Sequence, residues 1–253
     1  MASQTKVKEM IAKNNAKKGG LSDKIVPIIL AIISAISILT TIAILFTLLT
    51  ETITFFTRVP LSKFFLSGTW NPTGSSPEFG IWALIIGTLK ITVIATIVAV
   101  PIGLGAAIYL NEYASDRSRR IIKPILEILA GIPTIVFGFF ALTFVTPILR
   151  NLIPNLGEFN SISPGIVVGI MIVPMITSMS EDAMSSVPDK IREGAFGLGA
   201  TKFEVATKVV LPAATSGVVA SIVLGISRAI GETMIVSLAA GSSPTSSLSL
   251  TSS

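Results

Sequence analysis

Long stretches without a charged residue are the feature that most constrains the fold of this chain. Five of them, each of 19 or more residues, separate its charged residues: 25–50, 91–111, 128–149, 159–180 and 209–227. A helix needs about 18 to 20 apolar residues to cross a hydrocarbon layer roughly 30 Å thick. Each stretch meets this requirement, and the last is expected to continue to residue 240. The sequence therefore predicts an integral membrane protein with five transmembrane helices.

The composition narrows the class of protein further. Charged residues make up 13% of the chain and its mean hydropathy is +0.80, whereas an average soluble domain carries about 25% charged residues. The chain contains no Cys and no His. It thus lacks the residues that form disulfides and thiolate zinc sites and that serve most often as metal ligands and general bases. We expect no catalytic residue, no metal site and no cofactor bound by this chain, and a membrane enzyme is disfavoured.

The distribution of Lys and Arg predicts the orientation. Fourteen of them fall in 1–24, 111–124 and 181–210, against three in 51–80 and 150–163. The excess of positive charge places the first set, with the N-terminus, in the cytoplasm. The first span is expected to be a retained anchor, since the apolar part of a cleaved signal peptide has only about 7–15 residues.

The predicted fold is an all-α integral membrane bundle. Its segments in order are a basic cytoplasmic N-terminus 1–24, span 25–50, an extracytoplasmic loop 51–80, span 81–110, a cytoplasmic loop 111–124, span 125–149, an extracytoplasmic loop 150–163, span 164–180, a cytoplasmic loop 181–212, span 213–240 and a Ser-rich extracytoplasmic segment 241–253.

Proline and glycine are frequent in the predicted spans, as at Pro101, Gly103, Pro133 and Pro174. Backbone groups freed by proline need partners from neighbouring helices or from a water-filled cavity. The pattern is typical of broken helices around a translocation path, and equally of ordinary kinks in close-packed membrane helices.

The loop 181–212 is predicted to form a compact helix–turn–helix. A first helix is expected to start at Pro188 with Ser186 as its cap, and to end at Gly199, where a left-handed residue commonly stops a helix. Residues spaced i, i+4 and i+7 give this helix one apolar face: Ile191, Ala195 and Leu198.

The second helix of the loop is expected to open at Thr201. Glu204 follows Thr201 by three residues, the spacing of a capping box, and the helix should end near Pro212. Its apolar face comprises Phe203, Ala206 and Val210. A DNA-reading helix–turn–helix is disfavoured, because residues 181–210 carry five acidic and four basic side chains.

Seven positions of this loop resemble the coupling loop of bacterial ABC importer permeases, which follows the pattern E-A-A-x3-G-x9-I-x-L-P. The matching residues are Glu193, Gly194, Ala195, Gly199, Val209, Leu211 and Pro212. Gly194 replaces an Ala of the pattern and Val209 replaces its Ile. The resemblance implies that this hairpin docks into a groove on a cytoplasmic ATPase subunit, with Glu193 and Gly199 carrying the coupling role.

Other segments are similar to the PstC-type permeases of the bacterial phosphate importer, a group of type I ABC importer permeases. They include Trp70-Asn71-Pro72, Leu110-Asn111-Glu112-Tyr113, Ala130-Gly131-Ile132-Pro133 and Gly231-Glu232-Thr233-Met234. The resemblance implies an ABC permease core over 81–253 and a bundle of six spans with a cytoplasmic C-terminus. Since only five spans are predicted, we expect the protein to continue beyond Ser253; the alternative is a natural five-span protein with a short extracytoplasmic tail.

The same resemblance implies a function and a set of partners. The chain would be a permease subunit that moves inorganic phosphate across the bacterial plasma membrane by alternating access. Its implied partners are a related PstA-type permease, a cytoplasmic ATPase dimer, an extracytoplasmic phosphate-binding protein and membrane lipid, but no nucleic acid. ATP and Mg would bind the ATPase, because this chain has no G-x4-G-K-[ST] phosphate loop.

Arg228 and Glu232 are predicted to lie on the transport path. Arg228 follows Pro212 by sixteen residues, about 24 Å along a helix, which places it towards the outer side. Its planar donor fork suits phosphate oxygens. Glu232, four residues on, would pair with it and keep the affinity low enough for release. The alternative is a purely structural pair within one helix.

Other polar groups have less specific interpretations. We expect Lys90 to reach the outer headgroups, Glu127 to favour the start of the third span, and Glu181 with Asp182 to lie at the boundary of the hairpin. The loop 51–80, with Trp70, either docks the binding protein or is a plain solvated loop.

Two other functions stay open: a permease of this family for another oxyanion or an organic solute, and an ion-coupled secondary transporter.

Overall fold

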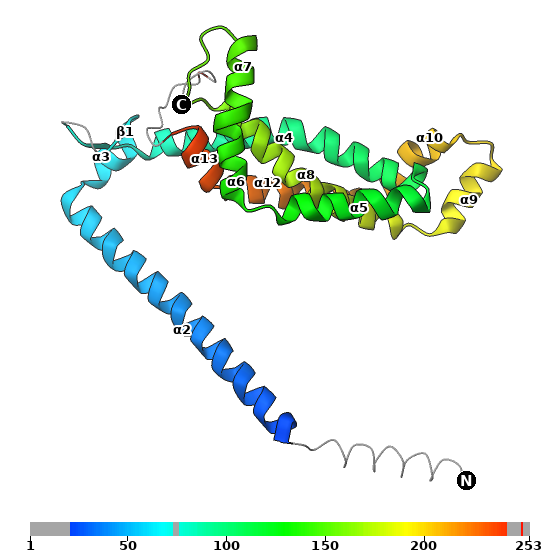
Figure 1. The fold of residues 1–253 in the computed structure, drawn as a ribbon, viewed down its shortest axis with the longest axis horizontal. Coiled ribbons are helices and arrows are strands. Elements are labelled where there is room, and N and C mark those ends of the chain that lie inside the picture. Colours follow the sequence, from blue (N-terminus) through cyan, green and yellow to red (C-terminus); the bar gives the residue numbers. More distant parts are fainter. Residues whose placement is uncertain (1–20, 73–75, 242–248, 250–253) are drawn as a thin grey trace. The chain divides into compact units, whose positions relative to one another are not determined.

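The first of the two compact units is dominated by one long apolar helix. The structure, a computed structural model, describes residues 21–72, 76–241 and 249, and the chain divides into the units Met1–Leu61 and Ser62–Ser253 (Figure 1). Helix α2 (Leu21–Arg58) has 38 residues. Threonine hydroxyls along it donate to carbonyls one turn earlier, as Thr40 does to Ile36 and Thr47 to Ala43. These bonds satisfy the hydroxyls within the helix, which lipid requires.

A short hairpin precedes the bundle of the second unit. After α3 (Leu61–Leu66), strands β1 (Trp70–Asn71) and β2 (Glu78–Phe79) pair antiparallel. The rings of Trp70 and Phe79 meet edge to face, with centroids 5.8 Å apart. The expected loop 51–80 is therefore shorter than predicted, because α2 continues to Arg58, and its later part contains a small structured element around a half-buried Trp70.

Two long helices run side by side at the centre of the second unit. They are α4 (Ile81–Ile108), extended by the π-helical turn η1 (Tyr109–Tyr113), and α8 (Ile162–Ser185). The Thr177 hydroxyl donates to the Gly103 carbonyl at 3.2 Å, and a Cβ at Gly169 would lie 3.0 Å from the Ala95 carbonyl oxygen. The two helices are thus parallel and approach closely, as small residues allow in membrane bundles.

The third expected span, 125–149, differs in the structure. Residues Asp116–Gly131 form a separate helix, α5, and a continuous helix then runs through α6 (Thr134–Phe140), η2 (Ala141–Val145) and α7 (Thr146–Leu152). Pro133 explains the break, since the residue before a proline is pushed out of the helical region, and Ile132 is extended with φ −67° and ψ 128°. The membrane-length helix therefore covers Thr134–Leu152.

The fifth expected span, 213–240, is also broken. The hairpin comprises α9 (Asp189–Gly197) and a second helix made of α10 (Lys202–Glu204), η3 (Val205–Val210) and α11 (Leu211–Ala213). The chain then bends by 76° into α12 (Thr215–Ile230). Three residues separate the end of α12 from α13 (Met234–Ala239). Figure 1 shows α9 and α10 at one end of this unit, and α7 and α13 towards the other.

The core lies where α8 meets its neighbours. One buried cluster joins α4, α8, α6 and α13 around Val168, Ile172 and Ile176, and a second, around Met184, Val205 and Val210, lies at the hairpin end. Within the described residues, four helices are long and apolar enough to cross a membrane, or five if the bent pair Lys202–Ala213 and Thr215–Ile230 counts as one span.

Candidate coupling site and embedded charges

The hairpin adopts the helix–turn–helix that its sequence predicts. Gly199 has φ +84°, the left-handed conformation that ends α9. Thr201 and Glu204 form the capping box in both directions: the Thr201 hydroxyl accepts the N–H of Glu204, and the Glu204 carboxylate accepts the N–H of Thr201 at 3.1 Å. The backbone N–H of Thr201, and then Lys208, lower the pKa of Glu204 from 4.5 to about 2.

The predicted start of the first hairpin helix is wrong in one respect. Pro188 is itself the cap residue, with φ −58° and ψ 136°, and α9 begins at Asp189. The Ser186 hydroxyl donates instead to the Ala183 carbonyl at 2.7 Å. Ser186 therefore closes the last turn of α8, which ends at Ser185, and does not open α9.

The positions that match the coupling pattern fall on two sides of the hairpin. Glu193 and Gly194 are exposed on α9, whereas Ala195 and Leu211 pack partly against the buried cluster at the hairpin end. Between the two helices runs an open groove lined by Ala195, Leu198, Gly199, Ala200, Glu204, Lys208 and Val209. Pro212 is exposed in the last turn before the bend.

Large apolar side chains remain uncovered on the hairpin. Of the predicted stripe of α9, only Ala195 packs inward, while Ile191 and Leu198 are 46% and 91% exposed. Phe196 and Phe203 are also exposed. Exposed apolar side chains gathered on one projecting element are typical of a surface that binds another protein.

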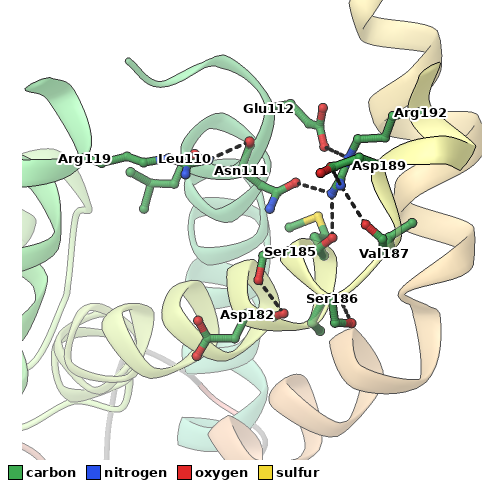
Figure 2. Close-up of polar contacts among 12 residues, drawn as sticks. Leu110, Asn111, Glu112, Arg119, Asp182, Ser185, Ser186, Val187, Asp189 and Arg192 are labelled. Carbon is green, nitrogen blue, oxygen red and sulfur yellow. Dashed lines mark hydrogen bonds and ion pairs between the residues drawn. The ribbon is translucent and has the colours of Figure 1, made fainter. Parts of the chain in front are cut away.

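Two arginines to which the sequence analysis gave no role meet at the end of α4, one from the hairpin and one from α5. Arg192 of α9 donates to side chains of η1, namely Glu112 Oε1 at 3.3 Å and Asn111 Oδ1 at 3.2 Å, and forms a salt bridge with Asp189 (Figure 2). Arg119 of α5 donates to the carbonyls of Leu110 and Asn111, each at 2.8 Å. For the Arg192 contacts the sequence offered only the Leu110–Tyr113 segment as a signal, because Glu112 and Asn111 lie about 80 residues from Arg192.

The two adjacent carboxylates at the end of α8 have different surroundings. Glu181 is buried and forms a salt bridge with Lys123 of α5 at 2.7 Å, whereas Asp182 is exposed. Glu127, which was expected to open a span, lies exposed within α5. In the described part of the chain, no three Asp or Glu side chains gather where they could hold a metal ion.

Arg228 and Glu232 do not form the pair that their spacing predicts. Arg228 is exposed in the last turn of α12, and the helix stops at Ile230, so that i, i+4 geometry is lost. The Glu232 carboxylate accepts the backbone N–H groups of Met234 and Ile235, at 3.0 and 3.2 Å. Glu232 thus satisfies donors at the start of α13. The salt bridges among the described residues do not include Arg228.

Lys90 lies inside the protein, not at an exposed position. Its side chain is on α4, the residue is 8% exposed, and its ammonium donates to the Ser249 carbonyl at 3.2 Å. The expected reach to the headgroups is therefore replaced by a contact with the C-terminal part of the chain.

A multi-pass helical bundle with a projecting hairpin and a break in its last helix defines the membrane component of an ABC importer. The chain belongs to the family described as binding-protein-dependent transport system inner membrane component, which matches residues 99–253. The predicted fold class is confirmed. The fold is also that of the MetNI methionine ABC transporter in an inward-facing crystal form, with a TM-score of 0.52 and 22% identity over 64% of this chain and 76% of that one.

Within the family, the chain is similar to PstC proteins, as the resemblance predicted. It is 37% identical to the phosphate transport system permease protein PstC of Haemophilus influenzae, over 72% of this chain and 63% of that protein. It is 38% identical to the probable ABC transporter permease protein YqgH of Bacillus subtilis, over 71% of this chain and 58% of that one. The chain spans about three fifths of the length of these curated relatives.

Proposed function

We propose that this chain is part of the permease subunit of an ATP-driven importer that moves inorganic phosphate into the bacterial cytoplasm by alternating access. The similarity to PstC proteins, at 37% identity in one case, is the observation that carries the proposal. The hairpin supports it, since an element that projects from the bundle with an exposed apolar surface suits a soluble partner that delivers force.

The partner of the hairpin is a cytoplasmic ATPase dimer, which binds ATP and Mg. Leu198 and Phe203 supply apolar contact area to it, and Glu193 supplies an exposed charge beside them. Gly199 sets the angle between the two helices, because only a residue tolerant of φ +84° closes this turn without strain. This assignment places the hairpin and the N-terminus in the cytoplasm, in agreement with the distribution of Lys and Arg.

The remaining partners lie in the membrane and outside it. A related PstA-type permease completes the membrane unit, and the exposed apolar side chains of α6, such as Phe139 and Phe140, are available to it or to lipid. An extracytoplasmic phosphate-binding protein delivers the anion, and the Trp70–Phe79 hairpin lies in the loop assigned to that side.

Arg228 is the residue proposed to contact phosphate on its way through the membrane. It is exposed about 20 Å along α12 from the hairpin, by the helical rise per residue. No carboxylate of the described residues neutralises it in a salt bridge, so its donor fork can meet phosphate oxygens. Glu232 acts differently from the sequence-based hypothesis: it holds the helix break that exposes this part of the path.

Uptake of radiolabelled phosphate tests the proposal. Cells lacking the gene would be compared with cells carrying the full-length gene, in the presence of excess sulfate or molybdate. Restored uptake that resists both competitors and stops on ATP depletion supports phosphate import. Uptake that sulfate or molybdate suppresses would assign another oxyanion, and unchanged phosphate uptake would contradict the proposal.

A further inference from the structure

One guanidinium joins three elements at the base of the hairpin. Arg192 donates five hydrogen bonds, the full capacity of its side chain. Nε meets Glu112 Oε1, Nη1 meets the Val187 carbonyl at 2.7 Å and Asp189 Oδ1 at 2.9 Å, and Nη2 meets Asn111 Oδ1 and the Met184 carbonyl at 2.7 Å. Figure 2 shows Asn111, Glu112, Val187 and Asp189 around this guanidinium.

The acceptors from the bundle lie at the ends of two of its helices. Met184 lies in the final turn of α8, where its carbonyl also accepts the N–H of Val187 at 3.2 Å, and Val187 lies just beyond the helix. Asn111 and Glu112 lie in η1, at the end of α4. The side chains of Glu112 and Arg192 are only 6% and 15% exposed, so the ion pair between them is poorly screened by water.

The end of α4 that Arg192 contacts is also held by α5. Arg119 of α5 bonds the Leu110 and Asn111 carbonyls, and α5 is tied to α8 by Lys123 and Glu181. The next residue after Arg192, Glu193, is exposed. On α9, Arg192 therefore contacts the bundle, whereas Glu193, the next residue, is exposed on the outside.

We propose that Arg192 is the positioning residue that makes the hairpin move as one body with α4 and α8, and so passes force from the ATPase to the bundle. The proposal rests on the proposed function in assigning an ATPase to the outer face of α9. Lysine cannot replace arginine in this role, because its single ammonium has three donors and no planar fork.

The first test measures phosphate imported per ATP hydrolysed. The full-length subunit, assembled with its partners in proteoliposomes, would carry Arg192→Lys, and Arg117→Lys would be the matched control because Arg117 is exposed in the first turn of α5. Arg192→Lys is expected to lower the ratio about tenfold, the effect of losing a hydrogen bond to a charged group, with ATP hydrolysis retained. An unchanged ratio would overturn the proposal, including the case in which import and hydrolysis fall in equal proportion.

A milder variant keeps the proposal testable if the subunit with Arg192→Lys does not assemble with its partners. Glu112→Gln keeps an oxygen acceptor but removes the charge, and should lower the ratio less than Arg192→Lys. Combined with Arg192→Lys it should add nothing, because two changes in one contact are not additive. Full additivity of the two effects would contradict a shared contact.

The second test does not depend on phosphate. The chain has no cysteine, so spin labels can be placed at Lys190→Cys on α9 and Ile102→Cys on α4, both exposed positions. The distance between the labels should stay constant when ATP binds and should vary in Arg192→Lys. A distance that already changes without the substitution would overturn the inference, whereas a constant distance in a complex that imports no phosphate would refute only the proposed function.

Discussion

Arg228 and Glu232 lie four residues apart in the sequence, but a break in the helix gives them different roles. Glu232 accepts two backbone N–H groups of α13, and Arg228 lies in the last turn of α12. A cation is favourable in the last turn of a helix because of the helix dipole, which stabilises Arg228 without a carboxylate. Its charge is thus compatible both with the fold and with a transient anion.

Arg228→Lys tests whether transport needs the planar guanidinium at this position or only its positive charge. Lysine keeps the cation but loses the bidentate fork, so we expect phosphate uptake to fall by about tenfold. Uptake would be measured at equal amounts of assembled complex, with Arg150→Lys as the control, since Arg150 is an exposed arginine in the last turn of α7. A normal uptake rate would rule out bidentate recognition by Arg228.

Glu204 makes the stability of the hairpin depend on pH. Because its pKa is lowered to about 2 from 4.5 in the folded hairpin, its charge stabilises the fold above about pH 4.5, and this contribution is lost as the pH falls towards 2. Glu204→Gln should remove the dependence. Hydrogen exchange of the hairpin amides in the two proteins, compared at each pH, should differ near neutrality and converge in acid. A constant difference across the range would contradict this role.

At the scale of helices, proline and glycine positions decide where the spans begin and end. The sequence predicts five apolar stretches, the capping box and the turn at Gly199, all from residues close together in the chain. It does not predict that Pro133 detaches α5, or that α12 stops before Glu232, because apolar content alone does not locate a break. The Arg192 contacts were equally inaccessible, since their partners on η1 are about 80 residues away.

The contact between α5 and α8 offers a test of how these helices are held. Lys123→Met should lower the free energy of unfolding by roughly 2 kcal/mol, less than for a fully buried pair because Lys123 is partly exposed. The cause is Glu181, which would be left buried without its cation. The double variant Lys123→Met with Glu181→Met should recover most of the loss.

Denaturant unfolding of the detergent-solubilised protein would measure these differences. Glu127→Gln, a change at an exposed site on the same helix, should have little effect. A double variant less stable than Lys123→Met alone would show that Glu181 stabilises the fold through contacts other than Lys123.

At the scale of the whole molecule, the second unit, Ser62–Ser253, combines a helical bundle with a projecting hairpin (Figure 1). The bundle is built around α8, 67% of whose most apolar stretch is buried, and the family match from residue 99 onward includes α8 and the hairpin. In this account the bundle holds the path, the hairpin receives force from an ATPase, and Arg192 connects the two. The proposed function requires each part for transport that depends on ATP.

ATP-driven accumulation of phosphate in proteoliposomes tests this account most directly. The full-length subunit and its partners would be reconstituted as the natural protein and as Glu193→Arg, a charge reversal at an exposed position of α9. We predict accumulation only with ATP in the first case, and an assembled complex without accumulation in the second. Accumulation that an ion gradient drives without ATP, or that Glu193→Arg leaves intact, would contradict the account.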